Sequence, residues 1–368
     1  MIETPSTYIP MDRRQALLHG RSIPEYTRGA ALFADISGFT ALTEALVEAL
    51  GPQRGAEELT HHLNQVYDAL IGELYCYGGS VLVFSGDAIT CWLDGDIGLR
   101  ATACALAMQA AMQQFQSVMI PSGATVSLAV KVAVATGSVR RVLVGDPSIQ
   151  IMDAMAGGTL DRMVAAEHHA NKGEVVLGPY ALASVARHAH IAEYRRGISH
   201  GSRYGVVADL LREVPPRPWR PIPPDALPVD EVRAWLLPQI YKRLSSGQGE
   251  FMAELRPAVA LFLRFSGLEY DVDHEAGEKL DTFVSQVQRI FARYDGAVLQ
   301  LTIGDKGNYL YAAFGAPITH EDNAMRAVSA AVDLREAIPS MPFIHDVQIG
   351  IAQGRMRTGA YGATVRRT

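Results

Sequence analysis

Short apolar runs alternate along this chain with longer segments whose apolar residues recur at helical spacing. The run 30–36 carries the acid Asp35 near its end and predicts a buried strand. Leu42, Leu46 and Leu50 then mark one face of a helix, which we expect to open at Ser37 or Thr40. A second helix is predicted by the apolar positions Leu59, Leu63, Val66, Leu70 and Leu74.

The next apolar runs predict a β-hairpin. Gly78 and Gly79 end the helical pattern, and the runs 80–84 and 88–93 flank a tight turn that carries Asp87. Further helices are expected over 101–115 and 160–170, and further strands over 126–136, 142–152 and 173–178. The order of these elements favours an α+β domain.

The composition changes in the middle of the chain, where seven prolines fall between Pro215 and Pro228. Such a segment forms a stiff, extended connector, and a ligand for a proline-binding domain is the alternative interpretation. The predicted segments are a lead-in over 1–29, a first domain over 30–212, a linker with a short helix over 213–256 and a second domain over 257–368.

The second domain repeats the first. The string Ala-Leu-Phe-Leu-Arg-Phe-Ser-Gly at 260–267 matches Ala-Leu-Phe-Ala-Asp-Ile-Ser-Gly at 31–38. The helix, the hairpin and the following strand also have counterparts, at 280–294, 296–311 and 347–354. A repeat of this length predicts two copies of one domain rather than a solenoid.

The two copies differ at chemically important positions. Arg264 stands in the second copy where the first has Asp35, and Lys306 follows Asp305 where the first copy has Ala88 after its acid. Because each copy has a candidate site residue that the other lacks, we expect a pseudo-two-fold pair with one working site between the halves. In the first copy a strand, a helix and a strand follow Gly145, whereas the chain stops soon after the matching glycine at 362, so we expect the second copy to be truncated.

Asp35 and Asp87 are the candidate metal ligands. If their strands formed a right-handed, parallel β-α-β unit, both acids would lie at the same rim of the sheet. The free amides of the helix that follows Asp35 would face an anion there. Either acid alone could instead be an ordinary helix cap or turn residue.

The strings Phe-Ala-Asp-Ile-Ser-Gly-Phe-Thr at 33–40 and Phe-Ser-Gly-Asp-Ala at 84–88 together resemble the class III nucleotide cyclases. The resemblance is strongest to the soluble, bicarbonate-responsive adenylyl cyclases and their bacterial relatives. It implies two tandem ferredoxin-like βαββαβ domains, the second incomplete. It also implies conversion of ATP to cyclic AMP and pyrophosphate, by attack of the ribose 3′-hydroxyl on the α-phosphate with two divalent metals, Mg²⁺ or Mn²⁺.

The resemblance also implies roles for single residues. Asp35, Asp87 and the Ile36 carbonyl would hold the metals, and Lys306 beside Asp305 would read the adenine edge. The amides that would cradle the phosphates are those of Ser37, Gly38, Phe39 and Thr40.

By the same resemblance, the family's transition-state Asn and Arg would lie beyond Thr368. The first half cannot supply them either, because its matching positions hold Asp161 and Ala165. We therefore expect residues 1–368 alone to have little activity. Val83 replaces a lysine that the bicarbonate-responsive type uses, which argues against that regulator.

Charge and cysteine content restrict the class of protein further. The formal net charge of −6 argues against a nucleic-acid binder, and the three cysteines lack metal-ligand spacing. Without a membrane span or a signal peptide, the sequence predicts a cytoplasmic protein that binds ATP and has further C-terminal domains in its parent chain. Two alternatives are a non-catalytic, cyclase-like regulatory module and a diguanylate cyclase, whose Gly-Gly-Asp/Glu-Glu-Phe loop this sequence lacks.

Overall fold

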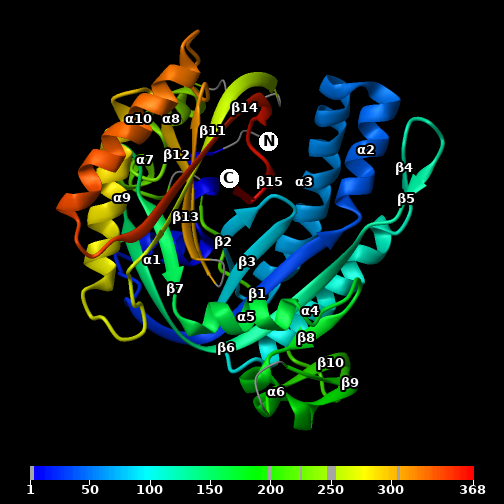
Figure 1. The fold of residues 1–368 in the computed structure, drawn as a ribbon. Coiled ribbons are helices and arrows are strands. Elements are labelled where there is room, and N and C mark those ends of the chain that lie inside the picture. The colour runs from blue at the N-terminus through cyan, green and yellow to red at the C-terminus, as the bar shows by residue number, and fades with distance from the viewer. Residues whose placement is uncertain (1–3, 198–200, 224–225, 247–253, 305–306) are drawn as a thin grey trace. The chain divides into compact units, whose positions relative to one another are not determined.

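The computed structural model describes residues 4–197, 201–223, 226–246, 254–304 and 307–368 (Figure 1). The chain forms two compact units. The first unit comprises Pro10–Val139, Gly157–Ala226 and Tyr361–Thr368. The second unit comprises Met1–Ile9, Arg140–Ala156 and Leu227–Ala360.

The sheet of the first unit has the strand order β2-β3-β1-β6-β8-β10-β9. Its strands are β1 (Tyr26–Ser37), β2 (Ser80–Ser85), β3 (Ala88–Asp94), β6 (Ala129–Val144), β8 (Val175–Leu177), β9 (Ala189–Arg196) and β10 (Arg203–Leu210). Strand β3 lies between β1 and β2 and is antiparallel to both, so β1 and β2 run parallel as expected but are not adjacent.

Helices cover both faces of this sheet. Alternate residues of β1, from Ala30 to Ile36, pack with α3 and α4 in the main core, and Phe33 on the opposite face packs near Ala166 of α5. Helices α2 and α3 lie side by side (Figure 1). The helices are α1 (Met11–Leu18), α2 (Phe39–Leu50), α3 (Pro52–Cys76), α4 (Leu99–Met112), α5 (Gly158–Glu167) and α6 (Pro179–Val185). The short elements are η2 (Gln113–Phe115), η3 (Ala186–His188), β4 (Val118–Met119), β5 (Thr125–Val126), β15 (Gly362–Ala363) and β16 (Arg366–Arg367).

The sheet of the second unit has the order β12-β13-β11-β14. Strand β7 (Met152–Ala156) of this unit pairs with the end of β6 instead. The other elements of the unit are η1 (Pro5–Tyr8), α7 (Val229–Arg233), α8 (Pro238–Ser245), β11 (Glu254–Ser266), α9 (Ala276–Ala292), β12 (Ala297–Gly304), β13 (Gly307–Phe314), α10 (Asn323–Ala337), η4 (Ile338–Ser340) and β14 (His345–Thr358). Leu261 and Leu263 of β11 pack against Phe283 of α9 in its core.

The same connectivity occurs in both units: strand, helix, two strands, helix, strand. With the strands numbered in chain order, the four central strands of each unit stand in the spatial order 2-3-1-4. This is the ferredoxin-like arrangement, so the predicted α+β fold is confirmed. A pseudo-two-fold relation between the halves stays a prediction.

One predicted strand is wrong in its bounds. The residues 142–144 finish β6, and a separate strand, β7, begins at Met152. Gly145 (φ 106°) begins the turn between them, and the Asp146 carboxylate accepts hydrogen bonds from the amide and hydroxyl of Ser148. An apolar run cannot reveal such a turn, because apolar residues continue on both sides of it.

Each unit also contains a segment from the far half of the sequence. In the second unit, Arg140 of β6 donates to the Asp273 carbonyl at 2.6 Å, and the amide of Gly145 donates to Asp281 Oδ1 at 2.7 Å. In the first unit, the amide of Gly362 donates to Asn64 Oδ1 at 3.0 Å. Each unit is therefore assembled from separate stretches of the chain, whereas the predicted domains are continuous stretches. The predicted domain boundaries stay a prediction.

The proline-rich connector packs along the first unit. The Arg217 amide donates to the Cys76 carbonyl at 2.8 Å, and the Trp219 indole donates to the Gly79 carbonyl at 2.7 Å. Two short helices, α7 and α8, follow it where the sequence predicted one.

Candidate active site

The two predicted metal ligands lie together in the first unit. Asp35 stands near the end of β1, directly opposite Ala88 of β3. Asp87 lies in the turn between β2 and β3, and its carbonyl accepts a hydrogen bond of 3.1 Å from the amide of Ile36. The acids lie at one rim because β1 and β2 run parallel and both end opposite the start of β3, where the hairpin turn carries Asp87.

The charge of this rim is incompletely balanced. Burial raises the pKa of Asp87, and the neighbouring negative charge of Asp35 raises it further. A hydrogen bond from its own backbone and the positive charge of Lys131 act in the opposite direction. The two carboxylates thus form a site at which an added cation would be favourable.

A buried tyrosine supports the turn that carries Asp87. Tyr67 of α3 is fully buried, and its hydroxyl donates to the Gly86 carbonyl at 2.8 Å. Its ring meets Phe84 edge to face with centroids 5.3 Å apart, and Tyr361 from the end of the chain packs on both rings. These contacts fix the position of the turn relative to α3.

The helix after Asp35 starts at Phe39 and not at Ser37 or Thr40 as predicted. Gly38 precedes it with φ 95°, and a Cβ there would lie 2.5 Å from the Ser127 carbonyl oxygen. Ser37 is the last residue of β1. Of the four amides predicted to contact phosphate, only those of Phe39 and Thr40 belong to the first helical turn. Amides in that turn lack partners within the helix, so they suit the predicted anion contact.

Sequence reasoning missed two charged residues at this rim. The Lys131 ammonium, on β6, lies 3.1 Å from Asp35 Oδ2 and also donates a short hydrogen bond to Glu167 Oε1 at the end of α5. Burial acts to lower the pKa of Lys131, but the hydrogen bonds and charges of Glu167 and Asp35 together outweigh it and raise the pKa. The available signal was that Lys131 is the only charged residue in the apolar run 126–136.

The donor chemistry of the rim fits a magnesium or manganese ion. Asp35 and Asp87 offer hard oxygen ligands, and the ammonium beside Asp35 already shows a cation accepted there. Within the described ranges, no three or more His, Cys, Asp or Glu side chains gather as a metal cluster. Backbone, water or phosphate oxygens would therefore have to complete the coordination.

The second unit has a different group at the equivalent position. Arg264 of β11 is paired with Tyr309 of β13, and its guanidinium lies within 4 Å of where a Cβ on Gly307 would stand. Asp305 and Lys306, the predicted base-reading pair, fall outside the described residues.

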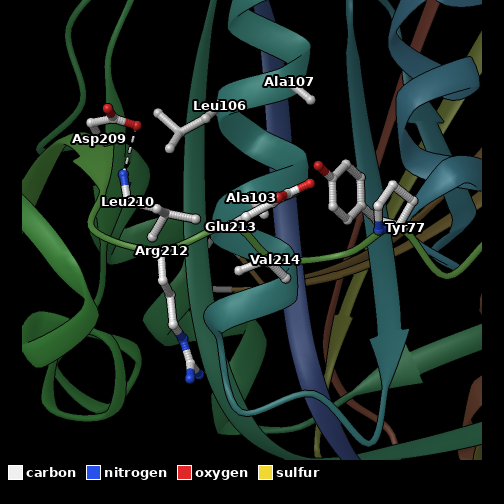
Figure 2. A pocket seen from close by; sticks show the side chains of 10 residues that line it. Tyr77, Ala103, Leu106, Ala107, Asp209, Leu210, Arg212, Glu213 and Val214 are labelled. Carbon is white, nitrogen blue, oxygen red and sulfur yellow. Dashed lines mark hydrogen bonds between the residues drawn. The ribbon is translucent and has the colours of Figure 1, made fainter.

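A separate groove of about 450 Å³ lies elsewhere on the first unit (Figure 2). Ala103, Leu106 and Ala107 of α4 form one wall. The rest is lined by Tyr77, Asp209, Leu210, Arg212, Glu213, Val214 and Pro216. None of the predicted site residues lines it.

Comparison with known proteins points to nucleotide cyclases. The chain is 23% identical over 377 residues to human adenylate cyclase type 10, covering 94% of this chain and 23% of that protein. The rabbit adenylate cyclase type 10 is also 23% identical, over 371 residues and 93% of this chain. These homologues confirm the resemblance predicted from the sequence, and the chain spans about a quarter of their length. No family model matches the chain.

Solved cyclase domains resemble about half of the chain. The guanylyl cyclase Cya2 is 20% identical with a TM-score of 0.42, covering 50% of this chain and 93% of that one. The adenylyl cyclase CyaB from P. aeruginosa is 19% identical with a TM-score of 0.42, covering 51% and 97%. The fold assignment itself rests on the strand order described above.

In the part of the chain that the structure describes, no helix is both long and apolar enough to cross a bilayer.

Proposed function

We propose that this chain is the catalytic region of an adenylyl cyclase, which converts ATP to cyclic AMP and pyrophosphate. The observation that carries the proposal is the meeting of Asp35 and Asp87 at the end of β1, beside the start of α2. The homologous adenylate cyclases support the same class of reaction, and ATP is the substrate by analogy with them.

The chain's own residues have separable tasks in this reaction. Asp35 and Asp87, with the Ile36 carbonyl, would hold two divalent cations. When bound, such ions lower the pKa of the 3′-hydroxyl and neutralise charge on the leaving phosphates. The first amides of α2 would orient the β- and γ-phosphates, because a helix start concentrates partial positive charge.

Selection of the base is assigned to Lys306 by analogy alone. An ammonium donor can bond to adenine N1, which is an acceptor, whereas guanine carries a hydrogen there. A Lys306→Ala variant should lower the preference for ATP over GTP, measured as the ratio of kcat/KM for the two nucleotides.

The decisive experiment measures cyclic AMP formed from ATP by the full-length protein with Mg²⁺ or Mn²⁺. Asp35→Ala and Asp87→Ala should each reduce the rate by at least about a hundredfold, the usual scale for losing a key charge-stabilising group. Asp209→Ala removes an exposed acid elsewhere on the same unit and should leave the rate unchanged. A full-length protein that makes no cyclic nucleotide with either metal would overturn the proposal.

One observation favours a second candidate, a cyclase-like regulatory module without turnover. The ammonium of Lys131 already pairs with Asp35 and would neutralise it without a metal. In that case Mn²⁺ would not bind at this rim, and ATP binding would be independent of divalent metals. Metal-dependent ATP binding that Asp35→Ala abolishes would exclude the module.

A further inference from the structure

We propose that Lys131 is a built-in counter-ion of Asp35 that must leave it when a divalent metal binds, and that Glu167 is the positioning residue that receives the displaced ammonium. The inference rests on the proposed function, because it concerns the same metal site. It assigns roles to two residues that the sequence motif does not include.

The geometry places one ammonium between two carboxylates. Lys131 Nζ lies 3.1 Å from Asp35 Oδ2 and also bonds to Glu167 Oε1. Asp35 lies on β1, Lys131 on the neighbouring β6, and Glu167 at the end of α5, which covers this face of the sheet. The ammonium can therefore give up Asp35 and still keep Glu167 as a negatively charged partner.

Partial burial makes this exchange important. The side chains of Lys131, Asp35 and Glu167 expose only 23%, 25% and 16% of their surface. Charges at such depth interact more strongly than they would in bulk water, and an unpaired ammonium there is costly. A metal ion that displaced Lys131 would leave it unpaired if Glu167 were absent.

The charge balance of the rim leads to the same conclusion. Asp35, Asp87 and Glu167 supply three negative charges and Lys131 supplies one positive charge, so two negative charges remain for a divalent cation. In Glu167→Gln only one negative charge remains for the cation. Of the two carboxylates that contact Lys131, only Asp35 is then left. Metal affinity should fall as a result.

The experiment measures Mn²⁺ binding by electron paramagnetic resonance, without nucleotide, so that it does not depend on turnover. Glu167→Gln should weaken Mn²⁺ binding about tenfold, and Lys131→Met should strengthen it by a similar factor. In the double variant the loss caused by Glu167→Gln should largely disappear, because no ammonium remains to be received. Glu193→Gln, which removes an exposed acid of the same unit, should change nothing.

Thermal unfolding without metal separates this role from a purely structural one. If Glu167 were only structural, Glu167→Gln would change the melting temperature of the metal-free protein. Any loss of Mn²⁺ affinity that it caused would then persist when Lys131 is also replaced. Equal Mn²⁺ affinity in the wild type, Glu167→Gln and Lys131→Met would overturn the inference and leave the proposed function intact. Mn²⁺ binding that Asp35→Ala fails to weaken would overturn both.

Discussion

Single residues near the rim that carries Asp35 and Asp87 are held by contacts that tolerate little change. Gly38 combines a left-handed backbone with a close approach to Ser127, and Tyr67 carries a buried hydroxyl whose acceptor is the Gly86 carbonyl. Both act at one remove from the acids, since they place the segments on which Asp35 and Asp87 stand. Substitutions at these positions therefore test the geometry of the site without touching a carboxylate.

The first prediction concerns Gly38→Ala. The positive φ and the 2.5 Å approach of the new Cβ to the Ser127 oxygen should lower the free energy of unfolding by about 1–3 kcal/mol. It should also weaken Mn²⁺ binding, because the segment that joins β1 to α2 must shift away from Ser127. Gly51→Ala is the matched control: φ there is 78°, but nothing lies within 4 Å of its Cβ. Equal destabilisation by both variants, measured by urea unfolding, would show that the contact with Ser127 is unimportant.

The second prediction concerns Tyr67→Phe. Loss of the 2.8 Å hydrogen bond leaves the Gly86 carbonyl without its tyrosine donor and should cost about 1–2 kcal/mol of stability. The looser turn should also reduce Mn²⁺ affinity at Asp87. Calorimetric unfolding and Mn²⁺ titration of the same samples provide the two measurements, and unchanged metal affinity would contradict the proposed support of the turn.

At the scale of elements, the outer strands of the first unit are joined by charge. Arg195 of β9 binds Glu174, just before β8, through two hydrogen bonds of 2.6 and 2.8 Å. It also donates to Glu193 on its own strand. The paired hydrogen bonds fix β9 to the start of β8, although β10 lies between the two strands.

This pair predicts a pH dependence of stability. The hydrogen bonds from Arg195 lower the pKa of Glu174 from its ordinary value of 4.5 to about 2. A carboxyl group with a lowered pKa contributes stability above its unfolded value and loses it as the pH falls through the folded value. The stability difference between the wild type and Glu174→Gln should therefore shrink between about pH 4.5 and pH 2. Parallel unfolding curves for the two proteins across this range would contradict the assignment.

At the scale of the whole molecule, the last eight residues fold with the first half of the sequence. Ala363 is fully buried in the first unit, and Arg366 is only 5% exposed. The Arg366 guanidinium lies 5.3 Å from the Phe84 ring centroid, and the Thr364 amide donates to Asp68 Oδ1 at 2.6 Å. Figure 1 shows this segment, in red, beside α3.

The fourth prediction follows from this packing. Deleting residues 361–368 removes several hydrogen bonds, each contributing about 1 kcal/mol, and should lower stability by at least about 3 kcal/mol. Mn²⁺ binding should weaken as well, because Tyr361 packs on Tyr67 and Phe84 beneath the Asp87 turn. Val365→Ala, at a half-exposed position, is the control for a small change in the same segment. A deletion variant as stable as the wild type would show that the segment is dispensable.

The order of the elements and the two acids of the candidate site could be predicted from local sequence patterns. Helical and strand periodicity follow from which side chains are buried, so the pattern around Asp35 and the hairpin at Asp87 could be predicted locally. The repeat predicted two similar domains, and the sheet of each unit has the same strand order.

The residues that surround those acids could not be predicted locally, because they come from distant segments that only the fold brings together. Lys131 and Glu167 stand far from Asp35 along the chain, and they meet it because β6 lies beside β1 and α5 covers the same face. The raised pKa of Asp87 likewise depends on burial and on a neighbour in another strand. Local patterns record burial but not which distant segment provides it, and that is why the counter-ion and its acceptor emerged only from the fold.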